Sequence, residues 1–149
     1  MKRKDSFVAT LAALGLGDSL YLAMVHWWGE EPQCGAYAGC AQVNASSYAE
    51  IFGIPVAALG SALYLGILAL AVWRLCAPTR RWWQLTVLLH ELVLAAVVFM
   101  AYLTAVELLV LHAVCYWCLA LAGISITLLL LLATDLFGST SPNWRSRAG

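Results

Sequence analysis

Residues 114–137 read VCYWCLALAGISITLLLLLATDLF, and this stretch decides the class of fold. Its only charged residue is Asp135, near the end of the stretch. A bilayer core about 30 Å thick is crossed by roughly 20 apolar residues in a helix. Three further stretches meet this condition, at about residues 7–28, 54–75 and 85–111. The sequence therefore predicts an all-α membrane protein, an antiparallel bundle of four transmembrane helices formed by residues 1–138.

The composition supports a membrane protein over a soluble one. Hydrophobic residues make up 63% of the 149 residues and charged residues 11%, about half the charged share of a soluble domain. A soluble domain of this size could not bury so much apolar surface, because small domains bury the smaller fraction of their area. The net charge is zero, which argues against nucleic-acid binding.

The basic residues predict the orientation of the bundle. All eight fall on one side of the four spans: Lys2, Arg3, Lys4, Arg74, Arg80, Arg81, Arg145 and Arg147. The positive-inside rule then places both termini in the cytoplasm and residues 29–53 and 112–113 outside it. We expect a multi-pass protein of the cell (plasma) membrane, with residues 139–149 as a disordered cytoplasmic tail. The first span is too long for the apolar region of a signal peptide, so we expect it to be retained.

The segment 29–53 is the only sizeable loop and is expected outside the cell. Within it, residues 46–50, SSYAE, predict a short helix lying at the membrane interface. Ser47 would cap this helix, with Glu50 three residues later completing a capping box. Pro55 would lie near the first turn of the second span, where its missing N–H costs nothing.

This topology divides the five cysteines between two compartments. Cys34 and Cys40 lie in the outer loop, and Cys115 and Cys118 lie at the outer end of the fourth span. Disulfides persist outside the cytosol and rarely within it. Four cysteines therefore share the oxidising face, while Cys76 is alone at the inner end of the second span, where an inert thiol is expected.

The outer cysteines predict an electron relay. Cys115 and Cys118 form a C-x-x-C motif at a helix N-terminus, where the helix dipole and free N–H groups lower the pKa of a cysteine. Cys118 should lie about one turn inside the apolar zone, within reach of a lipid-soluble quinone. Cys34 and Cys40 should be exposed, flexible and open to a protein thiol. Thiol–disulfide exchange can pass electrons between such pairs where their sulfurs meet.

Two other interpretations of the four cysteines remain open from the residues alone. They could form two structural disulfides in a non-catalytic membrane scaffold. They could also form a zinc site, because the spacings approach those of metal ligands, although an oxidising compartment and a membrane-embedded second pair argue against it. His26 and His112 show no spacing typical of haem ligands, and we expect neither a metal nor a haem.

The chain resembles the vitamin K epoxide reductase (VKOR) family over nearly its whole length. The residues that carry the resemblance are residues 40–55 (CAQVNASSYAEIFGIP), Gly60 and Tyr64, residues 17–21 (GDSLY), and residues 115–118 (CYWC). The resemblance is specific because four features occur together. They are the cysteine pair in the loop, a serine six residues after its second cysteine, a Gly-x-Pro sequence, and a C-x-x-C motif at a helix start. The resemblance favours the relay over structural bridges.

The resemblance implies a role for each cysteine. Cys118 would face the quinone, with Cys115 as its partner. Cys40 would exchange with Cys115, and Cys34 would receive the attack of an external thiol protein. Ser46 matches the family serine near the quinone pocket, where its hydroxyl could bind a quinone oxygen or hold the loop.

The implied activity is that of a thiol:quinone oxidoreductase which reoxidises a thioredoxin-fold partner and so drives disulfide formation outside the cytoplasm. The acceptor would be menaquinone or ubiquinone. Animal members of the family carry a tyrosine of the substrate pocket four residues after the second C-x-x-C cysteine, and this chain has Ala122 there. We therefore expect the protein to reduce a quinone and not vitamin K epoxide. Many bacterial relatives carry a fused thioredoxin-like domain, whereas this chain ends in a short tail, so its redox partner should be a separate protein. The DsbB type of oxidase is an alternative, but it carries its two cysteine pairs in the reverse order.

Acidic residues lie within the first and third predicted spans. An ionisable group in a span is costly and is a functional candidate by default. Asp18, near the middle of the first span, could relay a proton or could bond a neighbouring helix. Glu91 and Glu107 lie nearer the ends of the third span, where side chains can reach the interface or pair, and no function is expected of them.

Overall fold

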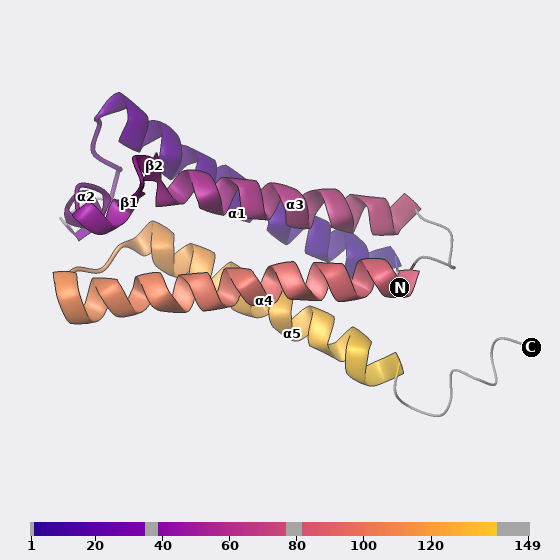
Figure 1. Cartoon of the computed structure of the whole chain (residues 1–149). Coiled ribbons are helices and arrows are strands. Elements are labelled where there is room, and N and C mark those ends of the chain that lie inside the picture. The colour runs from indigo at the N-terminus through magenta and orange to yellow at the C-terminus, as the bar shows by residue number, and fades with distance from the viewer. Residues whose placement is uncertain (1, 35–38, 77–81, 140–149) are drawn as a thin grey trace, which may run out of the picture.

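The predicted bundle of four helices is confirmed. The structure, a computed structural model, describes residues 2–34, 39–76 and 82–139. Within these ranges four helices are long and apolar enough to cross a membrane. They are α1 (Lys2–Trp28), α3 (Val56–Cys76), α4 (Trp82–Val106) and α5 (Tyr116–Ser139), and Figure 1 shows them running alongside one another. The protein is a multi-pass membrane protein with an all-α fold.

The helix boundaries lie close to those predicted. α1 begins at Lys2, five residues before the predicted start, because a helix can continue beyond the apolar stretch that spans the membrane. α4 ends at Val106 and continues as one wide π-helical turn, η3 (Glu107–Leu111). The predicted disordered tail lies, from residue 140 onward, outside the described residues.

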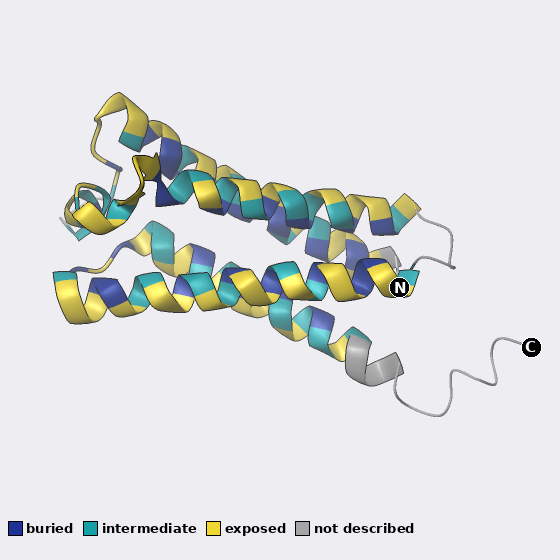
Figure 2. Cartoon of the chain, viewed as in Figure 1, coloured by how far each residue is buried: buried dark blue, intermediate teal, exposed yellow. Residues whose placement is uncertain are grey.

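The outer faces of the helices are apolar, as expected of lipid-facing surfaces. Leu65 is 55% exposed, Val98 62% and Leu130 63%. Figure 2 shows such exposed positions along the length of the four helices. In water these side chains would lose the stabilisation that burial provides, so a lipid environment completes the fold.

The helices pack as two close pairs, α1 with α3 and α4 with α5. Tyr64 of α3 is fully buried and joins the pairs. Its ring occupies the space where a side chain at Gly15 of α1 would lie, so only glycine fits at this position. Its hydroxyl lies 3.1 Å from the Leu121 carbonyl and 2.8 Å from the Ser125 hydroxyl, both on α5.

A buried cation holds the helices together near the chain termini. Arg74 of α3 is 4% exposed. Its guanidinium lies 3.2 Å from the Asp5 carboxylate of α1 and 2.7 Å from the Asp135 carboxylate of α5. The same group lies 4.4 Å from the ring centroid of Trp82 of α4. One side chain therefore contacts all three other helices.

The opposite end of the bundle, here called the loop end, comprises the described residues of 29–55 and 107–118. It carries α2 (Gly39–Asn44), the 3-10 helix η1 (Ser47–Ala49), and the strands β1 (Glu50–Ile51) and β2 (Ile54–Pro55). The two strands pair antiparallel, with Glu50 opposite Pro55 and Ile51 opposite Ile54. The short loop helix that the sequence predicts is confirmed.

The cap predicted for this helix is wrong in detail. The N-cap residue of η1 is Ser46, not Ser47, and it makes no capping hydrogen bond through its side chain. The Glu50 carboxylate lies instead 2.8 Å from Nε2 of His26 on α1. A long-range partner has replaced the local one, which the sequence pattern alone could not show.

Candidate active site

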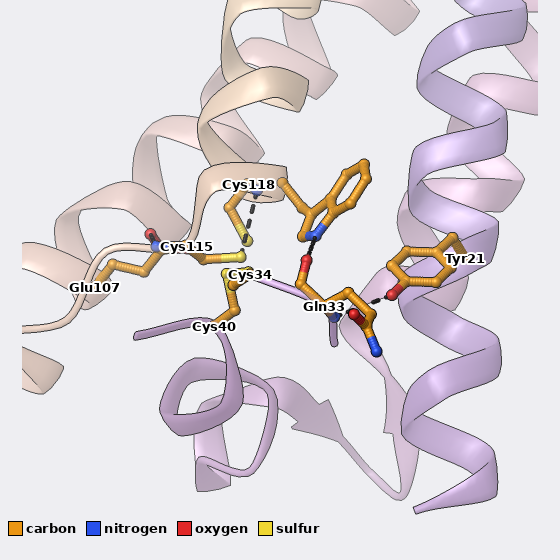
Figure 3. Close-up of a disulfide and its surroundings, with 8 residues drawn as sticks. Tyr21, Gln33, Cys34, Cys40, Glu107, Cys115 and Cys118 are labelled. Atoms are coloured by element: carbon orange, nitrogen blue, oxygen red, sulfur yellow. Dashed lines mark hydrogen bonds between the residues drawn. A yellow bond between two sulfur atoms is a disulfide. The ribbon is translucent and has the colours of Figure 1, made fainter. Parts of the chain in front are cut away.

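The loop end carries the four cysteines that the sequence singled out. Cys34 and Cys40 form a disulfide, with their Cα atoms 6.1 Å apart. Cys115 and Cys118 are free thiols. Figure 3 shows the disulfide facing these two thiols, and Cys40, Cys115 and Cys118 line the same cavity. The structure thus holds an oxidised pair beside a reduced pair.

Cys115 occupies the N-cap position of α5. Its carbonyl accepts a hydrogen bond from the N–H of Leu119, and its sulfur accepts one from the N–H of Cys118 at 3.5 Å. The hydrogen bond from the Cys118 thiol is the main cause that lowers the pKa of Cys115, and burial opposes it. Donors that converge on a sulfur stabilise its thiolate. This direction agrees with the expectation of an activated cysteine at this helix start.

Close backbone packing brings Cys40 to this thiol. Gly39 starts α2, and a Cβ atom at this position would overlap the carbonyl oxygen of Val114 and lie 3.0 Å from its nitrogen. Val114 directly precedes Cys115, and Gly39 directly precedes Cys40. The Gln42 side chain adds a hydrogen bond to the Leu111 carbonyl at 3.1 Å. The absence of a side chain at Gly39 therefore sets the approach of one cysteine pair to the other.

The other arm of the disulfide is held through Gln33. Its N–H donates to the Tyr21 hydroxyl of α1 at 3.1 Å, and its carbonyl accepts from the indole N–H of Trp117 of α5 at 3.0 Å. The rings of Tyr21 and Trp117 pack at a centroid distance of 5.1 Å. Because Gln33 directly precedes Cys34, these contacts anchor that cysteine too. Neither Gln33 nor Trp117 was predicted as a site residue, although Trp117 lies inside the C-x-x-C motif.

The prediction that both loop cysteines are exposed is wrong for Cys40. Cys40 is fully buried and Cys34 is half-buried. Cys115 is buried and Cys118 is half-buried. The difference arises because α2 packs against residues 111–114 instead of extending into solvent. An attacking protein thiol would therefore meet Cys34 more readily than Cys40.

Glu107 is a further residue of this site to which the sequence assigned no function. It lies at the start of η3 and is 3% exposed. One carboxylate oxygen, Oε2, accepts a hydrogen bond from the Cys115 N–H at 3.2 Å. The signal for it was an acidic residue in an apolar span, eight residues before the C-x-x-C motif. Glu107 does not reach the interface but is buried, and its side chain points toward the thiols, where it pairs with the Cys115 N–H (Figure 3).

The cavity beside the thiols is lined mostly by apolar side chains. They include Leu22, Val56, Met100, Leu103, Val106 and Leu121. Ligand sites of this kind are apolar clefts with a few placed polar groups. The polar contributors here include Ser19, Ser46 and Glu107. The chemistry of the lining fits an apolar aromatic ring with polar oxygens, such as a quinone.

Ser46 lines this cavity and also holds the loop. Its hydroxyl donates to the Val43 carbonyl at 2.7 Å. With its hydrogen engaged there, the oxygen remains able to accept a hydrogen bond. It could therefore accept one from a hydroquinone hydroxyl, whereas donating to a quinone oxygen would require the hydroxyl to rotate.

Of three other residues considered from the sequence, Asp18, His26 and Cys76, only His26 lines the same cavity as the thiols. Asp18 does not line the cavity, and its Oδ1 is buried with no hydrogen-bond partner in the described part of the chain. His26 lies 3.1 Å from the Asn44 carbonyl through Nδ1, in addition to its contact with Glu50. Cys76 is an exposed free thiol at the end of α3.

The arrangement disfavours the four-cysteine zinc site. Cys34 and Cys40 are bonded to each other, so their sulfurs are not free thiolate ligands. Within the described residues one group has ligand atoms close enough for a metal: Glu107, Cys115 and Cys118, whose ligand atoms lie within 4.8 Å of one another. Two of these three are the thiols of the redox pair, and a metal held there would block them.

A membrane bundle that holds a disulfide beside a free dithiol has the features of a membrane thiol–disulfide oxidoreductase. The family comparison agrees with this class, because the model of the vitamin K epoxide reductase family matches residues 6–133. The chain belongs to this family, and the resemblance drawn from the cysteine and loop motifs is confirmed. Members of the family are oxidoreductases that generally act with thiol partners and typically use quinones.

Proposed function

We propose that this protein is a thiol:quinone oxidoreductase. It reoxidises a thioredoxin-fold partner, passes the electrons through two cysteine pairs to a quinone, and so drives disulfide formation outside the cytoplasm. One observation carries the proposal. The buried sulfur of Cys40 shares a cavity with Cys115 and Cys118, so electrons can pass between the pairs by direct exchange.

The first part of the reaction takes place at the loop pair. A thiolate of the partner attacks Cys34, forms a mixed disulfide with it, and releases Cys40 as a thiolate. The second thiol of the partner then attacks the mixed disulfide, leaving the partner oxidised and Cys34 reduced. The partial exposure of Cys34 and the burial of Cys40 support this order of attack.

The second part passes the electron pair inward. The Cys40 thiolate attacks Cys115 of the Cys115–Cys118 disulfide and releases Cys118 as a thiolate. Cys34 then attacks Cys40, which re-forms the loop disulfide and leaves two reduced sulfurs at the start of α5. The pairing seen in the structure, with the loop bridge formed and the other two thiols free, corresponds to the state after this step.

The last part oxidises Cys115 and Cys118 to their disulfide and reduces one quinone, menaquinone or ubiquinone, to its hydroquinone. Two electrons and two protons leave the thiols and reach the two quinone oxygens. Cys118 is the sulfur assigned to the quinone, because it is half-buried and lines the apolar cavity. Ser46 is assigned as a hydrogen-bonding residue of the same site.

The basic residues support the placement of this chemistry. With both termini in the cytoplasm, the loop end lies outside the cell membrane. An oxidising compartment there matches the chemistry, since the periplasm of bacteria is kept oxidising by a disulfide relay that ends in quinone.

The test is a quinone-reduction assay on the full chain in detergent, with a reduced thioredoxin-fold donor and a short-chain ubiquinone. Cys118→Ser is expected to lower quinone reduction to the uncatalysed rate, because the second disulfide can no longer form. The loop pair of this variant should still oxidise one equivalent of donor. Cys76→Ser is the matched control, and its rate should equal that of the wild type.

A non-catalytic scaffold predicts a different result. Its Cys118→Ser variant would lose stability only, and neither the wild type nor Cys76→Ser would reduce quinone above background. That outcome would contradict the proposed function.

A further inference from the structure

A buried carboxylate lies against the reactive thiols. Oε2 of Glu107 accepts the hydrogen bond from the Cys115 N–H. Its other oxygen, Oε1, is buried and has no hydrogen-bond partner within the described residues. The carboxylate and the sulfurs of Cys115 and Cys118 lie within 4.8 Å of one another. A buried polar atom without a partner is costly, so Oε1 is a candidate for a function that appears only during the reaction.

The neighbouring ionisable groups do not neutralise this carboxylate. Besides the thiols, the titratable side chains that line the same cavity are His26 and Tyr48, and Cys40 is in its disulfide. His26 is engaged by Glu50 and by a backbone carbonyl. No lysine or arginine lines the described cavity. Glu107 is therefore the carboxyl group that can exchange a proton with the two thiols.

We propose that Glu107 is the proton-transfer residue of the Cys115–Cys118 pair. This inference rests on the proposed function, and it names the group through which the thiol protons leave. The Glu107 carboxylate accepts the proton of a thiol as its sulfur becomes a thiolate, and passes that proton to a quinone oxygen. The second thiol proton follows in the same way as the Cys115–Cys118 disulfide forms. Two protons and two electrons reach the quinone, and Glu107 ends as the carboxylate with which it began.

The charge balance within the cavity favours this route. An ionised group that is moved out of water is costly unless it is paired. When a proton passes from a thiol to the carboxylate, the site carries one negative charge before the transfer and one after it. A route through water would instead create a second negative charge beside the first. The apolar surroundings therefore favour the internal transfer.

The backbone holds Glu107 in place for this role. Its own carbonyl accepts hydrogen bonds from the N–H of His112 and from the N–H of Ala113 at 3.0 Å. His112 adopts a left-handed conformation, with φ 48°, and ends the π-helical turn there. π-helical turns are rare in proteins, and those that occur are often found at functional sites. Glu107 thus closes the α4–α5 connection through its backbone and reaches the thiols through its side chain.

The experiment is a single-turnover measurement. The full chain is reduced, freed of reductant and mixed with a short-chain ubiquinone, and quinone absorbance is followed across a range of pH. Glu107→Gln keeps an oxygen that can accept the Cys115 N–H bond but cannot carry a proton as a carboxyl does. Its rate is expected to fall about 100-fold or more, since general acid–base catalysis contributes typically 10²–10⁴-fold. The matched control is Glu91→Gln, at an exposed residue of α4, the helix that continues into η3, and this variant should react as the wild type does.

The pH profile separates proton transfer from a merely structural role. The wild-type rate should fall only at acid pH, where the carboxyl is protonated. The Glu107→Gln rate should rise continuously with pH, because hydroxide must then remove the thiol proton. Glu107→Asp keeps a carboxylate and should restore the wild-type shape of the profile and part of the rate.

Two results would overturn the inference while leaving the proposed function intact. One is a Glu107→Gln variant with wild-type rate and profile. The other, decisive if Glu107→Gln does not fold, is a Glu107→Asp variant whose rate rises continuously with pH. A wild type that reduces no quinone would instead contradict the proposed function itself.

Discussion

At Cys115 one sulfur atom is both a helix cap and a redox group. An N-cap side chain ordinarily accepts a hydrogen bond from the N–H two or three residues later. Here the acceptor is a thiol sulfur, and the donor is the N–H of Cys118. The N–H of Cys115 itself donates to Glu107. The same contacts that begin α5 therefore set the chemistry of the thiol.

The Cys118 side chain should control how readily Cys115 ionises. In a background in which Cys34, Cys40 and Cys76 are replaced by serine, thiolate absorbance is titrated in Cys118→Ser and Cys118→Ala. The hydroxyl of serine can still donate to the Cys115 sulfur, whereas alanine cannot. Because the hydrogen bond from residue 118 is the main cause that lowers the pKa of Cys115, the alanine variant should titrate at higher pH.

The outcome shows whether the thiolate of Cys115 is stabilised by a hydrogen bond from the side chain of residue 118 or by the N-terminus of α5. Equal midpoints in the two variants would show that the backbone of α5, and not the side chain at 118, stabilises the thiolate. A midpoint of the serine variant above that of an ordinary cysteine would contradict activation of Cys115 altogether.

At the scale of elements, α2 depends on its neighbours. A helix of six residues is too short to be stable alone, and α2 spans Gly39–Asn44. It is held by the packing of Gly39 on Val114 and by the bond from Gln42 to the Leu111 carbonyl. Its position, and with it that of Cys40, is decided by the α4–α5 connection.

Gly39→Ala should uncouple the two cysteine pairs. The added methyl would overlap the Val114 backbone, so α2 must move and Cys40 must move away from Cys115. We expect donor-dependent quinone reduction to fall about tenfold or more, since a misplacement of about 1 Å can cost 10²-fold. Quinone reduction by the pre-reduced protein in a single turnover should fall less, because Cys115 and Cys118 lie at the start of α5 and most residues of the cavity lining lie outside α2.

Gly17→Ala is the control for this substitution. A Cβ atom at Gly17 meets no atom within 4 Å, so both rates should equal those of the wild type. A Gly39→Ala variant with an unchanged donor-dependent rate would show that electron transfer between the pairs tolerates displacement of α2.

At the scale of the whole molecule, the two ends of the bundle differ in charge and chemistry. Near the termini, Arg74 joins all four helices through Asp5, Asp135 and Trp82. The loop end instead carries the two cysteine pairs and the apolar cavity. Removing one partner from a buried ion pair is strongly destabilising, so the Arg74 cluster fixes the helices at the end opposite to the cysteine pairs.

The proposed orientation predicts which thiols an impermeant reagent can reach. In intact bacterial cells treated with a mild reductant, a membrane-impermeant maleimide should label Cys34 and should not label Cys76. Both are accessible on the protein itself, Cys34 half-buried and Cys76 exposed, so a difference between them reports the side of the membrane. Detergent-solubilised protein, in which both should be labelled, is the control. Labelling of Cys76 alone in intact cells would contradict the proposed topology.

The sequence predicted the bundle well and the site in part. Apolar stretches locate membrane helices because the bilayer fixes their length and composition. The resemblance to the family singled out the four outer cysteines. Burial of Cys40 was not predictable, because it depends on α2 packing against residues 111–114, a segment distant in the sequence. The contact of Glu107 with Cys115 was not predictable for the same reason, since a π-helical turn directs its carboxylate there.

By itself the sequence determined four membrane helices, the family and the four cysteines that are proposed to carry electrons, because all three are encoded in local runs of residues. Only the tertiary structure decided which cysteines line the same cavity and which carboxylate lies beside them. Those facts depend on contacts between distant segments, Gly39 on Val114 and Glu107 on Cys115. Such close contacts result from the packing of helices, and the hydrophobic periodicity of the sequence does not predict them.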